Sequence, residues 1–174
     1  MPRRKHKRYS RPRKLYDIAL LKSETGLIKK YGLKNRREVW RADFAVGRIR
    51  NLAKKLITAD QAKKDQFVER QKAKGFSVAS IAEVLGLSKE DYLKRRLESI
   101  VVKKGFAKTH NQARQFIIHK HVTINGNSIN APSHFTTLKE EETIQLNLAL
   151  PQKKVISDEE KELLSKLNKS EEKK

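Results

Sequence analysis

The segment from Arg95 to Asn130 constrains the fold of this chain more than any other part of the sequence. Regularly spaced apolar residues predict one basic helix from about Lys89 to Lys104, which the turn Gly105-Phe106-Ala107 would end. Thr109, followed three residues later by Gln112, fits a capping box and predicts the start of a second helix. The residues expected to face the core are Leu93, Leu97, Ile100, Val101, Ala113, Phe116 and Ile117.

A β-hairpin is expected after the second helix. Asn125-Gly126 is a strong signal for a two-residue hairpin turn, and the apolar-rich runs beside it place Val122 opposite Ile129. An alternating apolar pattern from Ile144 to Leu148 predicts a final strand. The sequence therefore predicts an α+β fold, in which two helices pack against a short antiparallel sheet.

Cationic and amide side chains crowd around the starts of these two helices and the turn between them. Helix starts expose unpaired backbone N–H groups and the positive end of the helix dipole, so they favour phosphate. Arg114 is the strongest single candidate, because its planar guanidinium can bridge phosphate oxygens. Arg95 and Arg96 are expected on helix faces away from the core. The candidates in this segment are Arg95, Arg96, Lys103, Lys104, Lys108, Thr109, Asn111, Gln112, Arg114, Gln115, Lys120 and His121.

The charge of the whole chain points to the same class of ligand. It carries 41 Lys and Arg against 20 Asp and Glu, for a formal net charge of +21. A field of that size attracts polyanions, of which nucleic acid is the abundant one. A membrane surface is the alternative, but no apolar run approaches the roughly 20 residues of a span, and no signal peptide is evident. We expect a soluble, cytoplasmic nucleic-acid-binding protein.

Residues for other chemistry are missing from the sequence. There is no cysteine, which excludes disulfides and thiolate metal sites, and the five histidines lack the spacing of a zinc site. We find no Ser/His/Asp arrangement, paired buried carboxylates or glycine-rich phosphate loop. We therefore expect no metal, no cofactor and no enzymatic activity.

Two N-terminal segments add further cationic candidates. Residues 1–14 hold eight Lys or Arg, no acid and two prolines, which predicts a basic extended arm ordered only by a partner. Apolar residues spaced by three and four predict a helix from Asn35 to Thr58, where Asn35 with Glu38 resembles a capping box. Trp40 is expected to pack against a neighbouring helix rather than a base. The candidates in these segments are Arg3, Arg4, Lys5, Arg8, Arg37, Arg41, Arg48 and Lys55.

Residues 77–97 allow a different interpretation. Gly86 interrupts an apolar run and Ser88 can cap a new helix from Lys89, a pattern that resembles a helix-turn-helix. A recognition helix reads bases with its N-terminal residues, and the acids Glu90 and Asp91 at this helix start oppose DNA. A DNA regulator is therefore an alternative that the sequence does not favour.

Three segments resemble the small-subunit ribosomal protein four family, in its archaeal and eukaryotic branch. They are YGLKNRREVWRADFAVGRIR at residues 31–50, LGLSKEDYLKRRL at 85–97 and GFAKTHNQARQFIIHKHVTINGNSINAPSHF at 105–135. The third is also similar to the alpha-L RNA-binding motif, which pseudouridine synthases and tyrosyl-tRNA synthetases share. An RNA-modifying enzyme with such a motif would need a catalytic domain, for which the flanking segments are too short and polar.

The resemblance implies a primary rRNA-binding protein that nucleates assembly of the 30S body. It would contact a helix junction in the 5′ domain of small-subunit rRNA and the region where mRNA enters, with a contribution to translational accuracy there. Its other partners would be neighbouring small-subunit ribosomal proteins, and no membrane or homo-oligomer is expected. Some bacterial members hold zinc with N-terminal cysteines, which this chain lacks. The family's RNA contacts in the alpha-L motif correspond to Arg95, Arg96, Lys108, Thr109, Asn111, Gln112, Arg114, Gln115, Lys120 and His121.

We accordingly expect four parts along the chain. These are a basic extended arm at 1–14, a helical rRNA-binding domain at 15–90, an alpha-L RNA-binding module at 91–150 and a charged C-terminal tail at 151–174. Within the tail, Ser157 with Glu160 looks like a capping box and predicts a short, mostly solvated helix.

Overall fold

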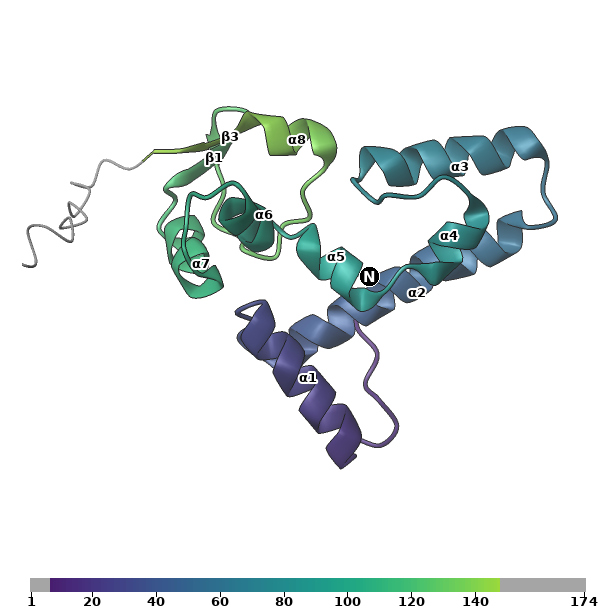
Figure 1. Ribbon diagram of the computed structural model, residues 1–174, viewed down its shortest axis with the longest axis horizontal. Coiled ribbons are helices and arrows are strands. Elements are labelled where there is room, and N and C mark those ends of the chain that lie inside the picture. The colour runs from purple at the N-terminus through teal and green to yellow at the C-terminus, as the bar shows by residue number, and fades with distance from the viewer. Residues whose placement is uncertain (1–6, 148–174) are drawn as a thin grey trace, which may run out of the picture.

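The computed structural model describes residues 7–147, which form a helical part and a smaller α+β part (Figure 1). The helical part contains α1 (Ile18–Lys30), α2 (Arg36–Leu56), α3 (Gln61–Ala73), α4 (Ile81–Gly86) and α5 (Lys89–Lys94). The α+β part contains α6 (Leu97–Lys103), α7 (His110–Ile118), β1 (Val122–Ile124), β2 (Asn127–Ser128), α8 (Leu138–Thr143) and β3 (Ile144–Leu146). The predicted α+β class is thereby confirmed.

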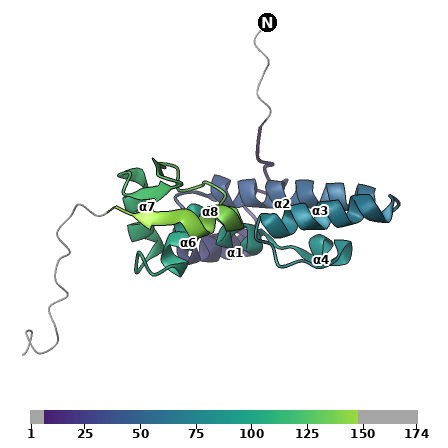
Figure 2. The ribbon, with the colours of Figure 1, turned by 90° about the horizontal axis from the view of Figure 1, so that it is seen from above.

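Helix α2 is the axis of the helical part, and α1, α3, α4 and α5 all pack against it. Its stripe of small and branched apolar residues, which includes Val39, Ala42, Val46 and Ala53, is buried as predicted. The expected capping box is wrong, because the Asn35 side chain accepts no cap hydrogen bond. Residues 7–14 contain no helix or strand, and Figure 2 shows the chain running away from the side of the helices toward its N-terminus.

A break between α5 and α6 corrects the prediction of one helix from Lys89 to Lys104. Ser88 caps α5 as predicted, but the backbone of Arg96 is extended and forms a strand-like bridge with Phe135. The Thr136 N–H donates to the Arg95 carbonyl oxygen over 3.0 Å, and the Leu97 N–H donates to the His134 carbonyl oxygen over 2.9 Å. These hydrogen bonds to a distant loop replace the helical ones, and they bring the two arginines to the boundary between the two parts.

The sheet of the α+β part follows the order β2-β1-β3, and both pairings are antiparallel. Asn125 and Gly126 have φ values of 51° and 79°, which form the predicted hairpin turn, and the Ile129 N–H donates to Val122 over 3.1 Å. The predicted strand at Ile144 pairs with β1; its expected end at Leu148 lies outside the described residues.

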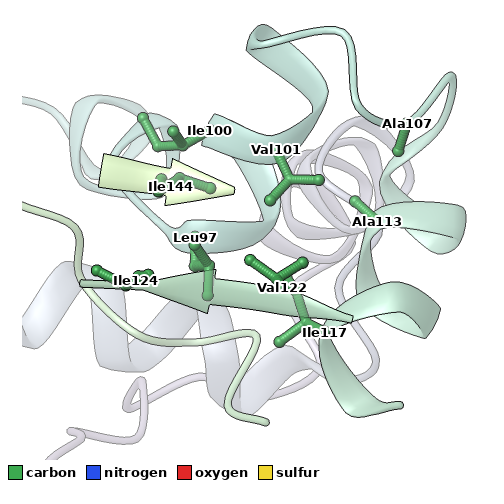
Figure 3. Close-up of a cluster of buried hydrophobic side chains, with 9 residues drawn as sticks. All are labelled: Leu97, Ile100, Val101, Ala107, Ala113, Ile117, Val122, Ile124 and Ile144. Carbon is green, nitrogen blue, oxygen red and sulfur yellow. The ribbon is translucent and has the colours of Figure 1, made fainter. Parts of the chain in front are cut away.

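Helices α6 and α7 pack against this sheet and bury one apolar core, shown in Figure 3. Leu97, Ile100 and Ile117 from the two helices point toward Val122 of β1 and Ile144 of β3. All five side chains have almost no solvent exposure. The predicted core of the module is therefore confirmed except for Leu93, which is buried beside Val39 and Ala42 in the helical part. Helices α8 and α1 are not predicted by the sequence patterns. No helix within residues 7–147 is long and apolar enough to cross a membrane.

Candidate nucleic-acid interface

Arg95 is buried, contrary to the expectation that it lies on an exposed helix face. Its side chain is 8% exposed, and its guanidinium donates to Glu141 over 2.7 Å and to the Thr136 carbonyl over 2.9 Å. It packs directly beneath Gly75, whose φ of 84° and lack of a side chain make room for the guanidinium. Arg95 therefore joins α8 to the helical part and presents little charge to a ligand.

Arg96 and Arg114 belong to a second group, which we name the buried ion cluster: Glu38, Arg96, Glu98 and Arg114. Arg96 donates to Glu38 of α2 and lies 3.5 Å from Glu98 of α6. Arg114 of α7 lies 3.2 Å from Glu38 and 3.5 Å from Glu98. Three helices from both parts of the molecule thus meet at four charges that balance one another.

Arg114 has internal partners that the sequence did not predict. Its side chain is 20% exposed, and its guanidinium is held by two carboxylates and by the Gly32 carbonyl oxygen over 3.4 Å. The adjacent start of α7 packs against the turn after α1, where the Tyr31 and His110 rings are 5.9 Å apart. Gly32, with a φ of 59°, allows this approach, because a Cβ there would lie 2.6 Å from the His110 Cβ. The end of α7 expected to bind phosphate is therefore partly docked against the helical part.

The two carboxylates of the buried ion cluster have pKa values that move in opposite directions. Burial raises the pKa of Glu98 to about 7 against the charges of Arg96 and Arg114. Burial also opposes ionisation of Glu38, but the hydrogen bond from Arg96 and the two guanidinium charges lower its pKa. Glu38 is consequently the carboxylate of the cluster that stays ionised at neutral pH, and Glu98 is the one that exchanges a proton near neutral pH.

The cations of α2 lie in different surroundings. The side chains of Arg37, Arg41, Arg48 and Lys55 are all exposed and form no ion pair with any residue between 7 and 147. They line the face of the helix away from its buried apolar stripe. This agrees with the sequence, in which Arg41, Arg48 and Lys55 recur every seven residues, or about every two helical turns. These four cations give α2 a positive face that no carboxylate between residues 7 and 147 neutralises.

A second group of polar residues surrounds the turn between α6 and α7. Thr109 caps α7 as predicted by accepting from the Gln112 N–H over 3.3 Å. The Gln112 side chain accepts from the Lys108 N–H over 3.0 Å, so the reciprocal half of the expected capping box does not form. The side chains of Lys108, Asn111 and Gln115 are exposed. This surface can donate hydrogen bonds to an anion, with Lys108 as its free charge.

The remaining candidates flank this turn, follow α7 or lie near the N-terminus. Lys103 is exposed beside Glu141 at 3.1 Å, and Lys104 lies over the Phe106 ring at 6.0 Å. Lys120 has a φ of 61° in the turn after α7, and His121 is half-buried with its ring edge-on to Phe116. Arg8 is exposed, whereas Arg3, Arg4 and Lys5 lie outside the described residues, as does the helix expected at Ser157.

Sequence reasoning missed the acidic partners that distinguish these groups. Glu38 was expected to cap a helix, and the sequence analysis assigns no role to Glu98 or Glu141. For Glu98 the available signal was its isolation in a segment rich in Lys and Arg, whereas Glu141 is the middle one of three consecutive glutamates and carried no such signal. Within residues 7–147, no group of three or more His, Asp or Glu is placed to hold a metal ion.

Comparison with known proteins gives two consistent findings. The S4 domain family model matches residues 95–141. Small ribosomal subunit protein uS4 of Methanosphaera stadtmanae is 38% identical over 149 residues, which cover 82% of this chain and 82% of the relative. The protein of the same name from Methanothermobacter thermautotrophicus is 37% identical over 163 residues, or 89% of this chain and 94% of the relative. The protein of the same name from Korarchaeum cryptofilum is 38% identical over 148 residues, which cover 82% of this chain and 89% of the relative.

Proposed function

The chain belongs to the uS4 family of small ribosomal subunit proteins, and from this premise we propose that it is a primary rRNA-binding protein that nucleates assembly of the 30S body. Its target would be a helix junction in the 5′ domain of small-subunit rRNA, near the region where mRNA enters. There it would contribute to translational accuracy and contact neighbouring ribosomal proteins. The relatives are ribosomal proteins rather than enzymes, which agrees with the non-enzymatic role predicted from the sequence.

The observation that carries this proposal is the unpaired positive face of α2. Phosphate contacts supply a large share of the affinity in protein–nucleic acid binding, and a cation that no internal carboxylate neutralises has its full charge available for them. Arg41, Arg48 and Lys55 lie along one side of a single helix and pair with no carboxylate among the described residues, 7–147. We assign the main phosphate contacts to this face, with Arg37 at its start.

The surface around the turn between α6 and α7 would add shorter-range contacts. Its exposed amides and hydroxyl can bind 2′-hydroxyl groups and base edges, which is the way proteins recognise irregular RNA. The residues proposed to contact rRNA from this surface are Lys103, Lys104, Lys108, Thr109, Asn111, Gln112 and Gln115. Lys120 and His121 would do so from the turn after α7, and Arg3, Arg4, Lys5 and Arg8 from the arm. We propose a positioning role for Arg95, Arg96 and Arg114, since each holds internal carboxylates.

The alternative of a DNA regulator finds little support in the environment of α5. This helix packs along α2, and Leu93 on it is fully buried. Glu90 at its start binds Lys30 over 2.9 Å and also accepts from the Tyr31 hydroxyl. A recognition helix must enter the major groove with its N-terminal residues, and here those residues are committed to α1.

The proposal is tested by binding and by sedimentation. We expect the purified protein to bind a 5′-domain rRNA fragment at physiological salt, and duplex DNA of equal length to fail to displace it at equal concentration. In a cell extract, the protein should sediment with the small subunit. Displacement by DNA at equal concentration would instead show nonspecific capture of polyanions, and sedimentation apart from the small subunit would contradict the ribosomal role.

A further inference from the structure

A hollow lies beside the start of α2, where the N-terminal segment passes the helix. It encloses about 630 Å³, and its lining includes Tyr9, Arg11, Lys34, Arg37 and Trp40. This volume falls within the roughly 300–1,000 Å³ of pockets that hold small organic ligands. No acidic side chain among residues 7–147 lines it. The hollow therefore combines flat aromatic surface with uncompensated positive charge.

The aromatic wall of this hollow consists of Tyr9 and Trp40, of which Trp40 is held in place by α1. The Tyr9 and Trp40 rings are stacked, with centroids 6.3 Å apart and planes at 28°. The Trp40 indole N–H donates to Glu24 of α1 over 2.8 Å, and Arg36 binds the other oxygen of that carboxylate. Glu24 is only 2% exposed. Trp40 thus packs against a neighbouring helix as predicted, and its ring is in place before any ligand binds, which lowers the entropic cost of binding.

Of the four cations around this wall, one is paired with a carboxylate and three have no ion-pair partner among the described residues. The Arg36 guanidinium lies over the Trp40 ring at 5.4 Å and is committed to Glu24. Arg11, Lys34 and Arg37 are exposed and have no ion-pair partner between residues 7 and 147. An aromatic surface ringed by free cations matches the two halves of a nucleotide, because a base stacks on an aromatic ring and its phosphate pairs with Lys or Arg.

We propose that this hollow holds one unstacked nucleotide of the bound RNA. Its base lies against the Tyr9 ring, and its phosphates lie beside Arg11, Lys34 and Arg37. The inference rests on the proposed rRNA binding and deepens it, since it assigns a single-stranded or bulged nucleotide to a specific site. Bases inside a duplex are paired and stacked, so a duplex cannot supply this ligand.

A nucleotide within a chain fits this site better than a free one. Residues 7–14 carry five Lys or Arg and no acid on one side of the hollow. On the other side, Arg41 and Arg48 continue the positive surface along α2. An RNA strand that enters along one of these surfaces and leaves along the other has cations for its backbone throughout.

The chain contains a single tryptophan, so the emission of Trp40 reports on this hollow alone. We would titrate the full-length protein with a 5′-domain rRNA fragment, a short single-stranded RNA, the same RNA annealed to its complement, and adenosine monophosphate. Anisotropy of labelled RNA would measure binding in parallel. The rRNA fragment and the single strand should change Trp40 emission as they bind, whereas the duplex should leave it unchanged.

Two matched variants separate the hollow from general charge. Tyr9→Leu keeps an apolar side chain but removes the ring, and it should weaken binding of the single strand by roughly fivefold or more. Tyr16→Leu is the control, because Tyr16 is 83% exposed and lies outside the hollow; it should bind like the parent. Tyr9 belongs to none of the buried cores, so the unfolding temperature of the Tyr9→Leu variant should match that of the parent.

The outcomes distinguish this inference from the function on which it rests. If the rRNA fragment binds by anisotropy while Trp40 emission stays constant, or if Tyr9→Leu binds like Tyr16→Leu, the hollow is empty in the complex and only rRNA binding stands. If adenosine monophosphate matches the single strand at equal concentration, the site takes free nucleotides and the RNA assignment is overturned. If the rRNA fragment does not bind at all, the proposed function fails as well.

Discussion

Two sets of arginines in this protein lie in opposite environments. Arg96 and Arg114 meet Glu38 and Glu98 at the junction of α2, α6 and α7. Arg41 and Arg48, on the outer face of α2, are exposed and find no acidic partner in the part of the chain that the structure describes. The positive charge of a residue is therefore a poor guide to its role. What matters is whether a carboxylate within reach already holds that charge.

The buried arginines also hold the two parts of the molecule together. The buried ion cluster fixes the α+β part against α2, and Phe135 adds aromatic contacts with Phe76 and Tyr92 at centroid distances of 5.7 and 5.0 Å. The exposed face of α2 and the turn before α7 are thus presented in one fixed relation. Under this account, the buried arginines serve RNA binding indirectly, by positioning the residues that contact it.

The largest expected effect comes from breaking the buried ion cluster. Arg96→Met removes one of its two positive charges and leaves Glu38 and Glu98 with a single partner, Arg114. Removing one member of a buried ion pair typically costs about 3–5 kcal/mol of unfolding free energy. Urea denaturation would measure this loss. Arg48→Met is the matched control on α2 and should change stability by no more than about 0.5 kcal/mol.

A smaller effect concerns the pH dependence of stability. The pKa of Glu98 is raised by burial to about 7 in the folded protein. At a pH between the ordinary pKa of a glutamate and 7, Glu98 is therefore protonated in the folded state and ionised in the unfolded state. Stability from this group is therefore greatest at low pH and is lost as the pH rises to about 7. Glu98→Gln should abolish this loss.

The readout for Glu98→Gln is the difference in unfolding free energy between variant and parent. It should grow in favour of the variant by on the order of 2–3 kcal/mol between pH 4.5 and pH 8. Glu38 is present in both proteins. Because its pKa is lowered, its contribution to stability is lost as the pH falls, which is the opposite of the change expected for Glu98. A difference that stays constant over this range would contradict the assignment of the titrating group.

The smallest effect tests the surface around α7 apart from its charges. Thr109→Ala removes the side chain that caps α7, which should cost about 1 kcal/mol of stability. It should also weaken rRNA binding, because a frayed helix start no longer holds Lys108 and Gln112 in place. Thr109→Ser keeps the hydroxyl and should restore both properties. If the serine variant behaves like alanine, the methyl group rather than the cap is what matters.

Much of the fold could be predicted because its signals are local. The stripe of α2, the cap of α5 at Ser88 and the hairpin turn at Asn125-Gly126 each depend on residues close in sequence. Helix α8 also carries a local signal, a capping box between Thr137 and Glu140, but this helix was not predicted. The break at Arg96 has no such signal, because hydrogen bonds to residues 134–136 produce it.

The candidate site was harder to predict for the same reason. Arg96 and Glu38 are 58 residues apart in the chain, and Arg114 and Glu38 are 76 apart. Only the packing of α6 and α7 against α2 brings them together. Helical spacing correctly placed Arg41 and Arg48 on an exposed face, but it cannot reveal which cations a distant acid will hold.

The most direct test of this account compares two single substitutions in their effect on the salt dependence of rRNA binding. Arg48→Gln should reduce the slope of log K against log salt by about 0.7–0.9, the value for one phosphate contact, and leave stability unchanged. Arg114→Gln should lower stability while leaving the slope unchanged, since its charge is held by Glu38 and Glu98. A reduced slope for Arg114→Gln together with an unchanged slope for Arg48→Gln would contradict the division of roles between the buried and exposed arginines.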